Sequence, residues 1–145
     1  MRMSERYTLP PLTQEIYTTY YVDDTVNDFF VALKFYLVGI GMTNHRLVEN
    51  TTGTIKRRLG IGNRTVTFND IQQLCMTYAV CVFVWDYNVN EWLSFGDVPS
   101  CDFRILMFKE GDRYGYVLRN DDTSMADGTG RRRRQTRSAR RYSPS

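Results

Sequence analysis

A long apolar stretch with helical character sets the strongest limit on how this chain can fold. Residues 26–38 carry large apolar side chains on nearly every side of a helix, namely Phe29, Phe30, Leu33, Phe35, Tyr36 and Leu37. A surface helix shows such side chains along one stripe only. We therefore expect a central, buried helix. Residues 23–25 supply capping side chains ahead of it, and Gly39 and Gly41 favour its termination.

A second helix is predicted to run directly into a buried strand. Asn69 and Gln72 have the spacing of a capping box that opens a helix through about Tyr78. Residues 80–85 then form a continuous run of β-branched and aromatic side chains, which is typical of a buried strand. Earlier in the chain, residues 44–49 predict a short helix, and Gly53 is assigned to a loop.

The remaining strand signals complete a small sheet. Residues 17–22 favour a short strand or extended segment, and residues 104–108 and 114–118 predict two strands joined as a hairpin. Together these elements predict a mixed α/β (α+β) domain. Its central helix packs on a small, mostly antiparallel sheet.

Charge divides the chain into a mildly acidic body and a basic tail. The net charge is +3, yet residues 1–130 carry 12 basic and 16 acidic groups. The last 15 residues hold seven arginines: Arg131, Arg132, Arg133, Arg134, Arg137, Arg140 and Arg141. We predict an extended N-terminal arm over residues 1–19 with paired prolines, a globular domain over 20–120, and a flexible linker with an Arg-rich tail over 121–145.

The apolar and N-terminal segments also indicate where in the cell the protein is expected. The most apolar window, residues 29–42, contains Lys34 and is too short to span a bilayer. No secretory signal is recognisable at the N-terminus. We expect an intracellular protein of the cytoplasm or nucleus, without membrane contact, in a reducing compartment.

The sequence gives little support for a nucleophilic Cys/His pair, a zinc site or a phosphate-binding loop. His45 is the single histidine, so a nucleophilic Cys/His pair would need Cys101, the one cysteine expected to be exposed. Cys75 and Cys81 fall in apolar segments and resemble small core residues. An odd cysteine count without CxxC spacing argues against a disulfide framework, and the spacings match no zinc knuckle. Residues 60–62 lack the ending of a phosphate-binding loop, so no cofactor is predicted.

Three segments, in this order, resemble the OTU (ovarian-tumour) family of papain-like deubiquitinating cysteine proteases. Residues 25–33 match the family's Asp-Gly-Asn-Cys-Leu-Phe-Arg-Ala-Leu motif at Asn27, Phe30, Ala32 and Leu33. Residues 70–86 are similar to its helix-then-strand element, and residues 105–117 to its closing hairpin. At the catalytic positions, Asp28 stands in place of the nucleophilic cysteine, Arg113 in place of the histidine, and Gly115 in place of the orienting acid.

This resemblance implies an OTU-like fold without the family's catalysis. Asp28 cannot act as a thiolate, and Arg113 stays protonated and cannot serve as a general base. We expect the two to form a salt bridge that holds the helix against the hairpin. The resemblance also implies a protein partner, either ubiquitin or a ubiquitin-like modifier. A viral or mobile-element origin would place the protein in a host cell.

Two other classes of function stay open, one that acts through the basic tail and one that is structural. In one, the folded domain is a scaffold and the Arg-rich tail binds RNA or DNA, since guanidinium groups contact phosphates and release counterions. The same tail could instead act as a nuclear import signal. In the other, the chain is a capsid-type structural protein with a basic arm.

Overall fold

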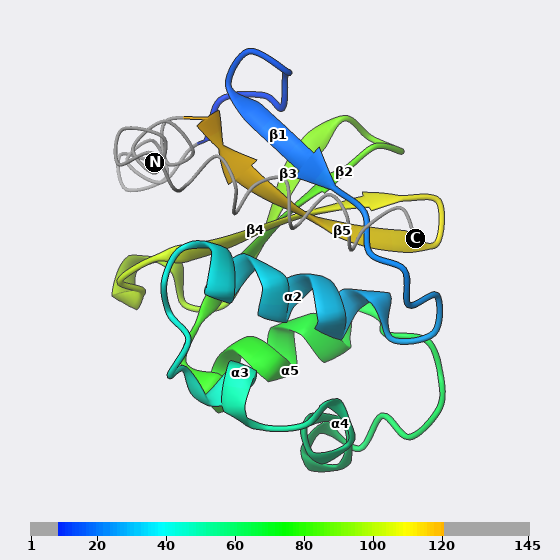
Figure 1. Cartoon of the computed structure of the whole chain (residues 1–145). Coiled ribbons are helices and arrows are strands. Elements are labelled where there is room, and N and C mark those ends of the chain that lie inside the picture. Colours follow the sequence, from blue (N-terminus) through cyan, green and yellow to red (C-terminus); the bar gives the residue numbers. More distant parts are fainter. Residues whose placement is uncertain (1–8, 121–145) are drawn as a thin grey trace.

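The computed structural model of the chain describes residues 9–120 and shows a mixed α+β fold, as predicted (Figure 1). Its helices are α2 (Asp28–Gly39), α3 (Arg46–Glu49), α4 (Thr52–Leu59) and α5 (Phe68–Tyr78). Its strands are β1 (Tyr17–Tyr20), β2 (Cys81–Asp86), β3 (Glu91–Phe95), β4 (Arg104–Glu110) and β5 (Arg113–Arg119), and the 3-10 turn η1 (Val98–Ser100) precedes β4. Within residues 9–120, no helix has the length and apolar character that crossing a bilayer requires.

All five strands form one sheet in the order β1-β5-β4-β2-β3. The pairs β1 with β5, β5 with β4 and β2 with β3 are antiparallel, whereas β2 and β4 run parallel. The expectation of a mostly antiparallel sheet is therefore confirmed. A parallel pair cannot be closed by a tight turn. Here β3 and η1 carry the chain back from the end of β2 to the start of β4.

The predicted central helix is confirmed as α2, which packs against β5 and β4 (Figure 1). Phe29, Phe30, Leu33 and Leu37 are buried, although Val38 at the far end is exposed. The predicted termination by glycine also holds, because α2 ends at Gly39 and Gly41 adopts a φ of +87°.

The predicted cap of α2 is wrong. Asn27 occupies the N-cap position and its side chain makes no capping hydrogen bond. Asp24 instead accepts hydrogen bonds from the backbone N–H groups of Val26 and Asn27, at 2.9 Å and 2.7 Å. This aspartate therefore orders the chain just before the helix.

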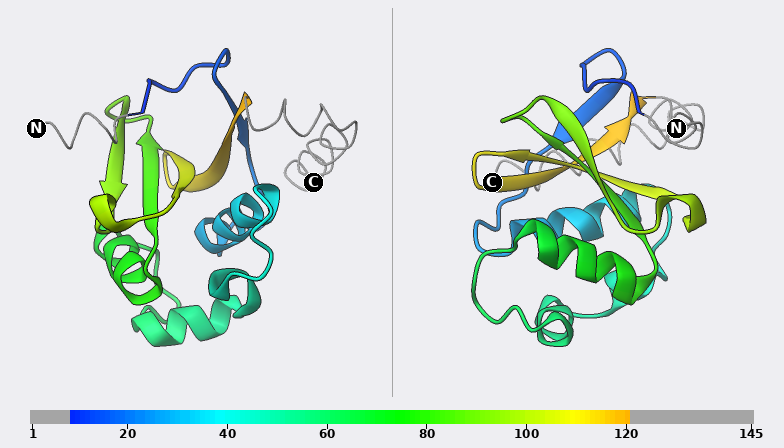
Figure 2. Two further views of the ribbon diagram at one scale, coloured as in Figure 1. Left: turned by 90° about the vertical axis from the view of Figure 1, so that its left-hand side faces the viewer. Right: turned by 180° about the vertical axis from the view of Figure 1, so that it is seen from behind.

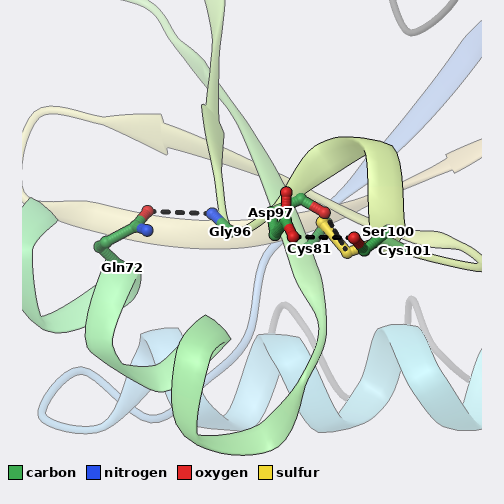
Figure 3. The surroundings of a disulfide bond; sticks show 6 residues. All are labelled: Gln72, Cys81, Gly96, Asp97, Ser100 and Cys101. Carbon is green, nitrogen blue, oxygen red and sulfur yellow. Dashed lines mark hydrogen bonds between the residues drawn. A yellow bond between two sulfur atoms is a disulfide. The ribbon is translucent and has the colours of Figure 1, made fainter.

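Helix α5 and strand β2 follow one another as predicted, but the capping box belongs to other residues. Thr67 accepts a hydrogen bond from the N–H of Asp70, and Asp70 accepts one from the N–H of Thr67. Asn69 lies inside the helix. Gln72 accepts a hydrogen bond from the N–H of Gly96 at 2.9 Å (Figure 3), so it joins α5 to the segment after β3.

Two elements were not predicted from the sequence. Helix α4 includes Gly53, which was assigned to a loop, and begins after Thr51, whose hydroxyl accepts a hydrogen bond from the N–H of Thr54 at 3.1 Å. Strand β3 pairs with β2 through the register Trp85 with Trp92. Strand β3 is an edge strand of the sheet, and its Glu91 and Ser94 are exposed.

The N-terminal segment joins the two outer strands of the sheet. Strand β1 places residues 17–19 in the sheet, so the arm assigned to residues 1–19 is too long by these residues. The carbonyl of Pro10 accepts hydrogen bonds from the Tyr17 hydroxyl at 3.2 Å and the Trp92 indole N–H at 2.8 Å. In the left view of Figure 2 this segment crosses from β1 to the β2 and β3 strands. The sheet is therefore curled, and its two edges approach each other.

The cysteine prediction is corrected by a disulfide between Cys81 and Cys101 (Figure 3). Cys81 lies opposite Arg104 in the parallel pairing of β2 and β4, which brings Cys101, three residues earlier, close to it. Cys101 is therefore not an exposed thiol. Cys75 is the free cysteine of the described region, and its burial raises the pKa of the thiol to about 12.

Candidate functional site

The start of α2 and the start of β5 meet at an ion pair. The Nε atom of Arg113 lies 3.1 Å from the Oδ2 atom of Asp28, and the two residues are 85 positions apart in the chain. The salt bridge expected between these residues is therefore present. Asp28 is the first residue of the helix whose apolar side chains form the core, so the pair couples the central helix directly to the hairpin.

The Asp28 carboxylate accepts hydrogen bonds from three donors. Oδ2 also accepts a hydrogen bond from the backbone N–H of Tyr114 at 2.9 Å, and Oδ1 accepts one from the N–H of Phe29 at 2.8 Å. Only 7% of the residue is exposed. A carboxylate in the first turn is further stabilised by the positive end of the helix dipole. These contacts together compensate the burial of the charge.

The strand pairing explains why the backbone N–H of Tyr114 donates to the Asp28 side chain and not to a neighbouring strand. Strand β1 covers β5 only as far as the pair Tyr20 with Tyr116. Beyond this point the outer edge of β5 lacks a strand partner, and the Asp28 carboxylate takes its place. A buried N–H group without an acceptor would be costly.

Arg113 links a third segment to the pair. Its Nη2 atom donates a hydrogen bond of 2.8 Å to the carbonyl of Val22, while its side chain keeps 39% of its surface exposed. The guanidinium thereby holds the segment between β1 and α2 against the hairpin. One cation fixes the three segments that surround the site.

Gly115, the third position singled out from the sequence, is enclosed on both sides. A Cβ atom built on it would lie 2.4 Å from atoms of the Phe108 ring and 2.4 Å from the carbonyl oxygen of Tyr20. Phe108 is its direct partner across the hairpin. No side chain fits here without movement of the strand, so an acidic residue cannot occupy this position in the present packing.

The rim of the site contains a contact that the sequence did not suggest. The Tyr21 hydroxyl donates a hydrogen bond to the Glu110 carboxylate, and this bond raises the pKa of Tyr21 to about 12. Glu110 is paired directly with Arg113 in the hairpin. The signal for this contact lies in the strand register and could not be read from local sequence.

His45 is used structurally. Its Nδ1 atom accepts a hydrogen bond from the N–H of Leu47 at 3.0 Å and so caps α3. Burial, with a smaller contribution from Arg46, lowers its pKa. Because Cys101 is bound to Cys81, the Cys101 and His45 pair considered from the sequence has no free thiol. The tail arginines, Arg131 to Arg141, lie outside the described residues.

Comparison with known proteins gives a likeness to solved structures but not to any family model or curated protein. No protein-family model matches the chain, and no curated protein matches it. Among solved structures, the chain is similar to the crystal structure of the viral OTU domain protease from Taggert virus, with a TM-score of 0.49 and 13% sequence identity. The match covers 75% of this chain and 85% of that chain.

Proposed function

We propose that this chain is a catalytically inactive OTU-like module that binds a protein partner, either ubiquitin or a ubiquitin-like modifier. The observation that carries the proposal is the ion pair between Asp28 and Arg113. These residues stand where the OTU motifs have the cysteine and the histidine, and the fold brings them together from segments 85 residues apart.

Inactivity follows from the chemistry of the two side chains. Amide hydrolysis in cysteine proteases needs a thiolate and a base that can accept its proton. Arg113 supplies a guanidinium, which is not a group that serves as the base. The Asp28 carboxylate is occupied by three donors, and Gly115 leaves no space for an orienting acid.

A binding role is supported by the surface beside the pair. Arg113 holds the segment that leads from β1 into α2, and this segment presents apolar side chains to water. Val26 is 77% exposed, and Tyr21 is also exposed while its ring packs edge-on against Phe108, with centroids 5.0 Å apart. Fixed, exposed apolar side chains are common in protein interfaces.

The test is a chemical-shift titration of the full-length protein with ubiquitin and with a panel of ubiquitin-like modifiers. We expect shifts at residues 21–28 and 110–115, and at least a tenfold higher Kd for Val26→Glu. Met76→Glu, which changes an exposed apolar residue on α5, is the matched control. No shifts with any modifier would reject the binding role. Cleavage of a ubiquitin chain by the unmodified protein would reject inactivity.

A second candidate function is nucleic-acid binding through the tail, in the cytoplasm or nucleus. It is supported by the seven arginines within residues 131–141. Replacing all seven by glutamine in the full-length protein should weaken salt-sensitive RNA or DNA binding at least tenfold and leave modifier binding unchanged.

A further inference from the structure

Two arginines from different helices converge on one tyrosine at the helical end of the molecule. The guanidinium carbon of Arg46, on α3, lies 4.9 Å from the centre of the Tyr78 ring. That of Arg58, on α4, lies 6.0 Å from the same centre. Figure 1 shows α4 at the end of the molecule opposite the sheet. We call Arg46, Arg57, Arg58 and Tyr78 the Tyr78 patch.

The patch is strongly cationic and has no internal neutralisation. Residues 34–64 contain six Lys and Arg residues and a single acid, Glu49. The ion pairs seen among residues 9–120, such as Arg64 with Asp70 and Arg113 with Asp28, do not involve Arg46, Arg57 or Arg58, so these three arginines have no carboxylate partner in that part of the chain. By contrast, the described residues outside 34–64 carry more acids than bases.

Tyr78 holds the guanidinium groups of Arg46 and Arg58 in place. The ring is only 3% exposed, and its hydroxyl accepts hydrogen bonds from Arg58 Nη1 at 3.2 Å and Asn50 Nδ2 at 3.5 Å. Arg57, next to Arg58, donates to the Thr54 hydroxyl at 3.2 Å. The arginine side chains therefore lose less freedom when an anion binds.

Helix stabilisation does not account for the whole arrangement. Arg57 and Arg58 lie in the last turn of α4, where cations interact favourably with the helix dipole. Arg46 belongs to another helix and reaches the same ring from α3. Bringing like charges together is unfavourable unless an anion lies between or above them.

We propose that the Tyr78 patch binds the phosphate backbone of a nucleic acid. Guanidinium groups match phosphate oxygens with two parallel hydrogen bonds, and three of them over adjacent helices offer successive contacts along a strand. The polar neighbours Asn50 and Thr54 can add further donors. This site uses residues other than the Asp28 and Arg113 pair and the tail arginines, and it does not rest on the proposed function.

The test measures the affinity of the full-length chain for a labelled single-stranded oligouridylate as a function of salt. To remove the contribution of the tail, the measurement uses the full-length variant with its seven tail arginines changed to glutamine. In this background we expect binding that weakens at least tenfold when Arg46→Gln and Arg58→Gln are combined. The slope of log K against log salt should become shallower by about 1.4, or about 0.7 for each lost contact.

Matched variants separate binding from structure. Lys109→Gln removes a cation from the hairpin, away from the patch, and should leave both affinity and slope unchanged. Arg46→Lys with Arg58→Lys should keep the slope while weakening the affinity, because charge is retained and the paired hydrogen bonds are lost. Far-UV circular dichroism and thermal melts confirm that each variant is folded.

Three results would overturn the proposal. One is an unchanged affinity and slope in the Arg46→Gln and Arg58→Gln variant. Another is no oligouridylate binding at all in the tail-substituted background. The third is binding to polyglutamate, or to vesicles containing phosphatidylserine, that equals or exceeds oligouridylate binding, because the partner would then be an acidic protein or a membrane. None of these results would affect modifier binding at the Asp28 and Arg113 site.

Discussion

The Phe108 ring fills the space that a side chain on Gly115 would need, and the two residues are direct partners across the β4 and β5 hairpin. The carbonyl of Tyr20 closes the other side, so the contact cannot be relieved by a rotation of the ring alone. This packing makes the absence of a side chain at position 115 a condition for the stability of the sheet.

Gly115→Ala should therefore destabilise the protein by about 1–3 kcal/mol, since the added methyl group overpacks the strand. Urea denaturation measures the change. Gly53→Ala is the control, because a Cβ atom at Gly53 meets only atoms at 3.9 Å and the residue lies inside α4. It should stabilise the protein by about 0.5–1 kcal/mol. Equal effects of the two substitutions would contradict the packing argument.

Removing Asp28 should lower the unfolding free energy more than removing its partner Arg113. Asp28→Ala leaves two backbone donors and a guanidinium without their acceptor, which should cost about 2–3 kcal/mol of unfolding free energy. Arg113→Ala should cost only about 0.5–1 kcal/mol, because the guanidinium is partly exposed and the carboxylate keeps its backbone donors. Chemical denaturation of both variants checks the order, and a larger loss for Arg113→Ala would refute it.

Acid should weaken the start of α5 within a defined pH window. The hydrogen bond from Arg64 is the main cause that lowers the pKa of Asp70 from 3.8 to about 2. A lowered pKa in the folded state gives stability that is present above about pH 4 and is lost as the pH falls toward 2. Asp70→Asn should therefore flatten the pH dependence of the unfolding free energy between pH 4 and pH 2. Glu91→Gln controls for the loss of one charge.

The disulfide should contribute about 3 kcal/mol, because it closes a loop across 20 positions of the chain. Mass spectrometry under non-reducing conditions should show one disulfide, between Cys81 and Cys101. Cys101→Ser should lower the melting temperature in the absence of reductant, and dithiothreitol should then have no further effect. Cys75→Ala retains the disulfide and should keep the sensitivity to reductant. If the melting temperature of the unmodified protein is the same with and without dithiothreitol, the disulfide adds no stability.

The sequence predicted those elements whose signal is local. The apolar residues around Phe29 identified α2, and the run that ends at Trp85 identified β2. The contact between Asp28 and Arg113 was expected only because the order of three segments resembled a known family. Their charges alone would not have joined residues so far apart.

The features that were missed depend on tertiary structure. The Cys81 and Cys101 bond requires the parallel register of β2 and β4, which no local pattern reveals. Gly53 is tolerated in α4 because Thr51 caps the helix and Ile55 is buried beneath it. The residues that close around Gly115 come from two other strands, so its packing could not be inferred from the hairpin sequence.

The carbonyl of Pro10 has a consequence for the whole sheet. It is the shared acceptor for Tyr17 on β1 and Trp92 on β3, and Trp92 in turn packs against Tyr17 and Trp85 at centroid distances of 5.7 Å and 5.5 Å. A shortened chain that began at Leu12 would retain every strand yet lose this acceptor. The two edge strands, β1 and β3, would separate, water would reach the tryptophans, and the newly bare strand edges would favour self-association.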